Sequence, residues 1–243
     1  MSKNARVIFP YKKHNQHLDI IPLNTIQRKF PSLYQYLQVV KCKLDRPSRD
    51  IRPAPATNNE WHRYGRHQSL EACEINEKLI VGVNSQCDKY AVDIKGTLVS
   101  SGGTAGYCLV SVPDGNPYSI YYIQAILGSI QGEWLASLYG EIFKGGFIAR
   151  GTKVLKQMPI RTIDFSNAVE KQVHDGIVDR QRRLITLGDR IAQNAGNARR
   201  LTPLQRQFDA LKAEQQQAIN ALYGMNEQTV ALIPIIKDLY ATD

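Results

Sequence analysis

The segment Trp61–Leu70 concentrates the side chains that could carry out specific recognition chemistry. Its sequence, WHRYGRHQSL, holds two arginines, two histidines, one glutamine and two aromatic residues. Arg can contact a guanine edge through two hydrogen bonds, Gln can do the same for adenine, and Tyr or Trp can pack on bases or sugars. Gly65 would allow close approach of the backbone. The composition indicates nucleic-acid recognition, and a cationic surface turn anchored by a buried Trp61 is the structural alternative.

No comparable cluster of residues in the sequence indicates enzyme chemistry. The glycine-rich segment 100–107 (SSGGTAGY) lacks the Gly-Lys-Ser/Thr ending of a phosphate-binding loop, and a Gly-x-Ser-x-Gly elbow is absent from the sequence. His14 and His17 form an isolated His-x-x-His without matching metal ligands. The acidic pair within residues 74–78 is more typical of a solvated turn than of a nuclease site. The sequence therefore favours a binding protein, with a stand-alone nuclease or small transferase as the enzyme alternative.

Positive charge is concentrated in the first third of the chain. The net charge of the 243 residues is +9; residues 1–70 contain 13 basic and 4 acidic residues, whereas residues 71–243 contain 18 of each. A basic region on an otherwise neutral protein indicates a polyanion partner, because cations close to phosphates release condensed counterions. A solubilising face, or a tail packed on an acidic neighbour, is the alternative interpretation.

The composition predicts a folded, cytoplasmic protein. Hydrophobic residues make up 43% and charged residues 22% of the chain, as in ordinary globular domains. No apolar run approaches the roughly 18 residues of a membrane span, and the first residues lack the apolar core of a signal peptide. The four cysteines form no CxxC pair, which is typical of free thiols in a reducing compartment.

Apolar periodicity predicts an α+β region in the first two thirds of the chain. Strands are expected over Lys78–Val83, Tyr90–Asp93, Thr97–Ser100 and Cys108–Val112, and the run Arg6–Phe9 before Pro10 is compatible with a further strand. Helices are expected over Ser32–Val40 and Tyr118–Leu138.

The remaining residues predict a long antiparallel helical hairpin followed by a short C-terminal helix. Thr202-Pro203 is expected to begin the second helix, whose coiled-coil stripe has one polar position at Gln215. Asn226 should begin the last helix, which is expected to end near Leu239. Two helices alone cannot bury both apolar stripes, so a third surface is required. The stripe expected on the first helix consists of Val169, Val173, Ile177, Leu184, Leu187 and Ile191.

Several short motifs occur in an order that resembles a known family, the TaqI-like C-terminal specificity (target-recognition) domain of bacterial adenine-specific DNA methyltransferases. The same domain occurs in single-chain restriction-modification enzymes and in phage-defence methylases. The resemblance covers most of residues 5–233. The motifs that carry it are Val7–Tyr11, Phe30–Leu37, Leu44–Arg46, Trp61 with Tyr64–Leu70, Lys78–Val81, Gly102–Tyr107, Ile126–Ser129, Met158–Ile160 and Ile219–Met225.

The resemblance implies a DNA target-recognition domain over residues 1–165, built on a mixed twisted β-sheet with flanking helices. Residues 166–243 would form a helical spacer that docks on a partner. The family's catalytic methyltransferase domain is missing from this sequence, so the chain is either a separate specificity subunit or a fragment. No catalytic residue, metal site or cofactor is expected in it; S-adenosylmethionine, and magnesium as a second candidate, would be bound by the catalytic partner.

The expected partners are double-stranded DNA, a methyltransferase domain or subunit, and a second copy of the chain through the helical hairpin; no membrane is expected. A protein-interaction module that uses the hairpin alone is the remaining alternative. Arg66 and Gln68 rest on the family motif and could instead brace the domain's own fold. The expected phosphate-contacting residues are Lys12, Lys13, Arg49 and Arg52. The expected groove-facing residues are Arg63, Tyr64, Gly65, Arg66, Gln68, Gly102, Gly103, Thr104, Lys144 and Arg150.

Overall fold

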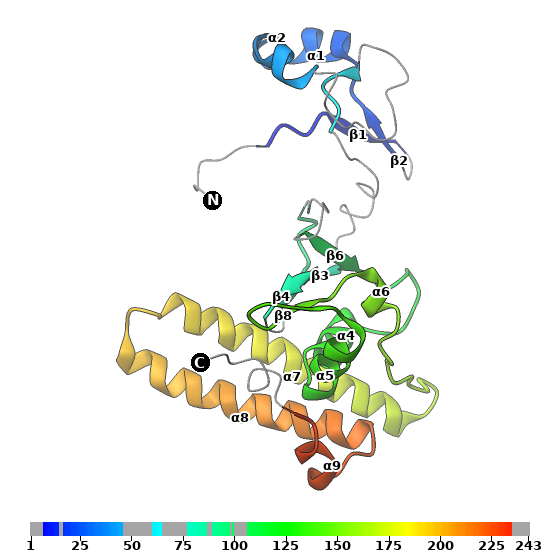
Figure 1. The fold of residues 1–243 in the computed structure, drawn as a ribbon, viewed down its shortest axis with the longest axis vertical. Helices are drawn as coiled ribbons and strands as arrows, with labels where there is room; N and C mark the ends of the chain where they lie inside the picture. The colour runs from blue at the N-terminus through cyan, green and yellow to red at the C-terminus, as the bar shows by residue number, and fades with distance from the viewer. Residues whose placement is uncertain are drawn as a thin grey trace. The chain divides into compact units, whose positions relative to one another are not determined.

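Two compact units, Met1–Ile75 and Asn76–Asp243, make up the chain in a computed structural model (Figure 1). The structure describes residues 7–14, 17–45, 60–64, 77–86, 89–97, 99 and 106–234, and for Lys13 and His17 it describes the backbone alone. Small antiparallel sheets with packed helices precede a long helical hairpin and a short last helix, which confirms the predicted fold class. The functional division at residue 165 stays a prediction.

The first unit is a β-hairpin followed by two helices. Strands β1 (Tyr11–His14) and β2 (His17–Ile20) pair antiparallel, and helices α1 (Leu23–Lys29) and α2 (Pro31–Leu44) follow. Pro31 is the first residue of α2, where its missing N–H costs nothing, and it disfavours helical geometry at the preceding residue. The two helices are therefore separate. Their small apolar core consists of the buried Ile26, Leu37 and Trp61.

The second unit contains two three-stranded antiparallel sheets. In the first, the order is β5 (Tyr90–Asp93), β3 (Lys78–Gly82) and β6 (Tyr107–Val110). In the second, the order is β4 (Asn84–Ser85), β8 (Phe147–Ala149) and β7 (Ile142–Phe143). These strands include three that the sequence predicts, with ends that differ by at most two residues. The strands predicted over Arg6–Phe9 and Thr97–Ser100 are wrong in their described residues, 7–9, 97 and 99, which lie outside any strand.

Val83 connects the two sheets. It lies between β3 and β4, its N–H donates to the Gly106 carbonyl (3.1 Å), and its carbonyl accepts from the Arg150 N–H (2.6 Å). The two sheets are therefore joined by the backbone before any side chain contributes.

The single helix expected over Tyr118–Leu138 is wrong, because the structure has two helices there, α4 (Ile120–Leu127) and α5 (Ile130–Tyr139). Ser129 separates them: its Oγ accepts from the Gly132 N–H (3.1 Å) and donates to the Ile126 carbonyl (2.7 Å). A Cβ atom at Gly132 would lie 2.3 Å from that same carbonyl, so only glycine permits this tight reversal. The apolar periodicity continues across the break and therefore conceals it.

The long hairpin pairs α7 (Ala168–Gln193) with α8 (Ala198–Leu222), which run antiparallel side by side (Figure 1). At 1.5 Å per residue each helix is about 37–39 Å long. None of the helices in the described ranges combines the length and apolar character that a membrane crossing requires. The third surface that the sequence requires is α4, whose Tyr122 and Ile126 form one buried cluster with Ile177 and Ile219 of the hairpin. A short α6 (Thr152–Leu155) packs near α5.

Two predicted helix ends are wrong. Helix α8 begins at Ala198, where the Asn197 side chain accepts from the Arg200 N–H, so Pro203 lies inside the helix instead of at its start. The last helix, α9 (Glu227–Ala231), does begin after Asn226 but ends well before Leu239. Packing against α7 therefore extends α8 beyond its strongest local start signal.

The predicted apolar stripes of α7 and α8 are confirmed in the middle of the hairpin, but the stripe of α7 is not confirmed at its N-terminal end. Gln215 is buried in α8, and its amide donates to the Ile177 carbonyl (2.9 Å) while its oxygen accepts from Arg180 Nε (3.0 Å). Val169 and Val173, expected in the core, are 70% and 39% exposed. The residue of the first turns of α7 that packs on α4 is His174, whose ring contacts the Tyr122 ring.

A buried ion pair closes the first sheet. Lys78 Nζ in β3 lies 3.0 Å from Asp93 Oδ2 in β5, and the Lys78 side chain is fully buried. Burial opposes ionisation of Asp93, but hydrogen bonds from Lys78, Thr97 and the Lys95 N–H outweigh it and lower the Asp93 pKa to about 2.

We expect Asp93→Asn to lower the free energy of unfolding at pH 7 by about 3 kcal/mol, because Lys78 would keep an uncompensated buried charge. The Asp93 carboxyl ionises at a lower pH in the folded chain than in the unfolded chain, where its pKa is about 4. Its contribution is therefore complete above about pH 4 and is lost as the pH falls towards 2. Urea denaturation at several pH values should show the difference between the two proteins shrinking over that interval.

Asp114→Asn, at an exposed turn residue, is the matched control and should change stability by less than about 0.5 kcal/mol. A stability difference for Asp93→Asn that stays constant from pH 7 to pH 2 would contradict the assigned role.

Candidate nucleic-acid interface

The described part of the Trp61–Leu70 segment anchors the first unit. Trp61 is buried in the core with Ile26 and Leu37, and His62 Nε2 lies 2.9 Å from the Ile21 carbonyl. Burial lowers the pKa of His62, a shift that its hydrogen bond to Ile21 only partly offsets. Trp61 is therefore buried, as the structural alternative expects, whereas residues 65–70 lie outside the described residues and the choice between the two interpretations stays open there.

Arg63 and Tyr64 are held by the protein itself. Arg63 donates to Glu60 Oε2 at 2.6 Å, and only 13% of its side chain is exposed. The Tyr64 hydroxyl donates to the Ile8 carbonyl (2.6 Å), and its backbone N–H donates to the Tyr11 hydroxyl (2.8 Å). Both residues are expected from the sequence to face the groove; in this structure each makes hydrogen bonds within the first unit instead.

The β1–β2 hairpin presents the first exposed basic group. Lys12 is exposed and pairs across the strands with Asp19, and His14 Nδ1 lies 3.5 Å from Asp19 Oδ2. Lys13 follows Lys12 in the same strand. Asp19 offsets only part of the positive charge of the two lysines, so an incoming phosphate would still meet an accessible cation at Lys12.

The β7–β8 hairpin is a second exposed element, and it carries both a basic residue and aromatic residues. A three-residue loop, Lys144–Gly146, joins Phe143 to Phe147, which face each other in register. Gly145 and Gly146 have φ of 82° and 72°, a conformation that favours glycine. The Gln86 amide donates to the Gly145 carbonyl (2.8 Å), so the loop is also held by the residue that follows β4.

Lys144 is exposed on this loop, between two exposed aromatic rings. Phe143 is 46% and Phe147 is 37% exposed. Lys144 was expected to face a ligand; the two aromatic residues were not. The signal that could have identified them is the sequence FKGGF, in which a glycine pair indicates a tight turn and leaves the flanking rings on a short hairpin.

Arg150, also expected in the groove, lies in the protein interior, and this expectation is corrected. Its side chain has no exposed surface, and its Nη1 donates to the Ser85 carbonyl (2.6 Å) and Oγ (2.9 Å). Its Nε and Nη2 donate to the Glu133 carboxylate, whose other hydrogen bond comes from the Tyr90 hydroxyl (3.0 Å). Arg150 therefore joins β8 to β4, α5 and β5.

The remaining expected site residues lie outside the described residues and stay predictions. They are Arg49, Arg52, Gly65, Arg66, Gln68, Gly102, Gly103 and Thr104. Within the described ranges, His, Cys, Asp and Glu side chains form no group of three that could hold a metal ion.

The different roles of Arg150 and Lys144 can be separated by stability. We expect Arg150→Met to lower the free energy of unfolding by about 3–5 kcal/mol, because the partly buried Glu133 carboxylate would lose its cation. Lys144→Ala, on the exposed loop, should change it by less than about 0.5 kcal/mol. Chemical denaturation of both variants tests this, and equal small effects would contradict the structural role of Arg150.

Comparison with known proteins places these features in context. No protein-family model matches the chain. The chain is 44% identical over 237 residues to the type II restriction enzyme and methyltransferase RM.Eco57I of Escherichia coli. The match covers 98% of this chain but only 23% of that protein's length. The chain is thus related over nearly all of its length to one segment of a restriction-modification enzyme.

Proposed function

We propose that the chain is a target-recognition module of a restriction-modification system, which binds double-stranded DNA at a specific sequence and positions a separate adenine methyltransferase domain on it. The observation that carries the proposal is the exposed β7–β8 hairpin, whose loop carries Lys144 and is flanked by the exposed Phe143 and Phe147. Relatedness to a segment of a restriction-modification enzyme supports DNA as the ligand. The TaqI-like domain is the proposed family, because its motifs occur in order along the chain.

The β7–β8 hairpin has a shape that suits a DNA groove. The major groove of B-DNA is about 12 Å wide and admits a two-stranded β-ribbon. Lys144 would contact a phosphate or a guanine edge, while Phe143 and Phe147 would pack on a thymine methyl group or a sugar. The glycine turn and the Gln86 hydrogen bond hold the loop in one conformation, so little conformational entropy would be lost on binding.

The amino-terminal basic region would supply the general affinity for DNA. Lys12, Lys13, Arg49 and Arg52 would contact phosphates, and cations in these positions add a salt-dependent term to binding. Arg66 and Gln68, together with the loop at 102–104, would read base edges. Arg63 and Tyr64 would instead brace the segment that carries Arg66 and Gln68, since their own hydrogen bonds are made within the first unit.

The helical hairpin would dock on the methyltransferase domain. Its middle is already covered by α4, so the free apolar surface is at the first turns of α7, where Val169 and Val173 are exposed. S-adenosylmethionine would be held by that partner, and the assembly would act in the cytoplasm, where the DNA is. This division of labour would leave base recognition and catalysis on different folding units.

We expect Lys144→Ala to weaken binding to duplex DNA and to reduce the slope of log K against log salt by about 0.9 unit, the effect of one lost phosphate contact. Phe143→Ala should weaken binding without changing that slope, because an apolar contact releases no counterion. Fluorescence anisotropy at several salt concentrations measures both quantities. Lys171→Ala, which removes an exposed cation on α7, is the matched control and should leave binding unchanged.

Arg66→Ala and Gln68→Ala should lower the discrimination between the preferred duplex and a random one by about 1–3 kcal/mol each. The preferred sequence is first obtained by selection from a random duplex library with the unaltered chain. Lys12→Ala should instead weaken all duplexes alike and flatten the salt slope by about one unit. Unchanged selectivity in both Arg66→Ala and Gln68→Ala would show that these residues do not read bases.

A further inference from the structure

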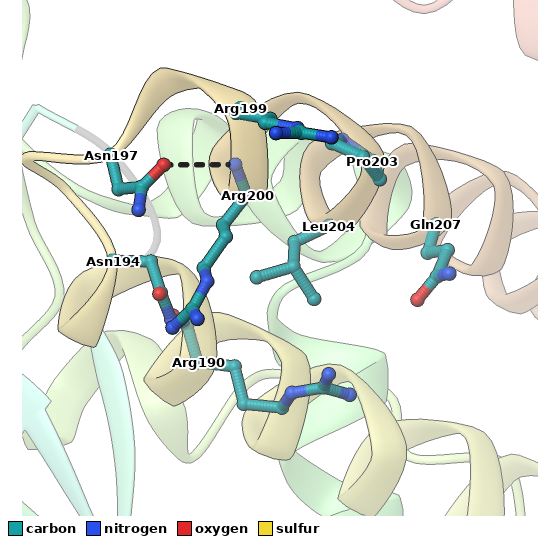
Figure 2. A pocket seen from close by; sticks show the side chains of 8 residues that line it. All are labelled: Arg190, Asn194, Asn197, Arg199, Arg200, Pro203, Leu204 and Gln207. Atoms are coloured by element: carbon teal, nitrogen blue, oxygen red, sulfur yellow. Dashed lines mark hydrogen bonds between the residues drawn. The ribbon is translucent and has the colours of Figure 1, made fainter.

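The turn that joins α7 to α8 carries a basic pocket that the proposed function does not use. The pocket measures about 780 Å³ and is open to solvent at the end of the helical hairpin (Figure 2). Its lining comes from both helices and from the turn between them: Arg190, Asn194, Asn197, Arg199, Arg200, Pro203, Leu204 and Gln207.

Three arginines line this pocket, and its lining includes no acidic residue. Figure 2 shows Arg200 extending from α8 towards Asn194, the residue that follows the last residue of α7. Arg190 comes from α7, and Arg199 lies along α8 beside Pro203. Residues 190–207 contain four arginines and neither Asp nor Glu. Among the described residues, the guanidinium groups of Arg190, Arg199 and Arg200 form no ion pair.

Arginines further along the hairpin behave differently. Arg180 donates to Gln215, Arg182 lies 4.7 Å from the centre of the Tyr121 ring, and Arg183 lies 3.7 Å from Asp179. Each of them therefore has a partner within the protein. The pocket arginines stand out because their charge is presented to solvent from two helices at once.

The position of two of these arginines is unfavourable for the helix itself. Arg199 and Arg200 lie in the first turn of α8, which holds no acidic residue. The N-terminus of a helix carries partial positive charge, so cations there are repelled by it. An anion in the pocket would remove this repulsion and would also be attracted by all three guanidinium groups.

We propose that this pocket binds a phosphate group of the DNA backbone, away from the bases that the module reads. The inference rests on the proposed function and extends it to the helical hairpin. Three guanidinium groups offer more donors than the two free oxygens of one carboxylate or of one backbone phosphate can accept. Successive phosphates of one DNA strand supply the further oxygens. No aromatic side chain lines the pocket, so it offers no stacking surface for a base or a free nucleotide. The hairpin therefore contacts DNA as well as its protein partner.

Single substitutions with a matched control test this site. Arg190→Ala and Arg200→Ala should each weaken binding to a random-sequence duplex several-fold, and together should flatten the salt slope by about 0.9 unit. The Lys substitution Arg200→Lys keeps the charge and should keep most of the slope. Arg206→Ala removes an exposed cation from α8 outside the pocket lining and should change neither quantity. Thermal unfolding of each variant shows that it is folded.

The outcomes separate this inference from the proposed function. If the unaltered chain binds DNA and the pocket variants keep its salt slope, the pocket inference is overturned and the proposed function stands. Loss of methyltransferase binding in those same variants would assign the pocket to an acidic protein surface instead. If Arg206→Ala weakened DNA binding as much as the pocket variants do, the effect would come from the general positive charge of the hairpin and the pocket inference would be overturned. Failure of the unaltered chain to bind any duplex would overturn both.

Discussion

The buried Arg150 guanidinium is the interaction on which the second unit depends. It follows β8 directly, and it binds Ser85 of β4 and Glu133 of α5, which in turn accepts from Tyr90 of β5. One side chain, with its carboxylate partner, thus connects both sheets and helix α5. The Arg150 side chain is fully buried and the Glu133 side chain is mostly buried. A misplaced strand would therefore leave a buried charge unpaired, which costs several kcal/mol. The arrangement at the base of the β7–β8 hairpin is therefore strongly specified.

Other buried polar side chains specify alignment in the same way. Lys78 and Asp93 pair across β3 and β5, at the end of the register that the backbone defines. Gln215 lies in the apolar seam of α8 and bonds to the Ile177 carbonyl and to Arg180 of α7. A slip of one helical turn would separate Gln215 from both partners and bury an unsatisfied amide. Hydrophobic burial stabilises these contacts, and the polar groups select one alignment among those that burial alone would allow.

The parts of the fold that were predictable from sequence are those that local pattern decides. The strands β3, β5 and β6, the hairpin and its polar position at Gln215 all follow from periodicity over a few residues. The helix break at Ser129 does not, because its capping hydrogen bonds interrupt a periodicity that continues on both sides. The sequence predicts too late a start for α8, because Thr202-Pro203 is a strong local start signal. The contacts with α7 that extend the helix to Ala198 come from residues distant in sequence.

The candidate site also shows that local sequence does not predict contacts between distant residues. An arginine beside a glycine-rich loop is usually exposed, and the burial of Arg150 depends on Glu133 and Ser85, which are 17 and 65 residues away. Trp61 could be assigned to the core from its type, whereas the hydrogen bonds that hold Arg63 and Tyr64 depend on Glu60 and on strand β1. Sequence identifies which side chains can bind DNA, and the fold decides which of them are free to do so.

Net charge hides this distinction, and residues 71–243 illustrate why. Residues 71–243 hold equal numbers of basic and acidic residues, which indicates a neutral surface. Several of the acids, however, are used within the protein: Asp93 and Glu133 pair with buried cations, and Asp175 and Asp179 pair with cations on α7. The basic groups at Lys144 and at the α7–α8 turn have no such acid in the described part of the chain. A stretch of chain with no net charge can therefore present two positive sites, because a phosphate interacts with the local arrangement of charges and not with their sum.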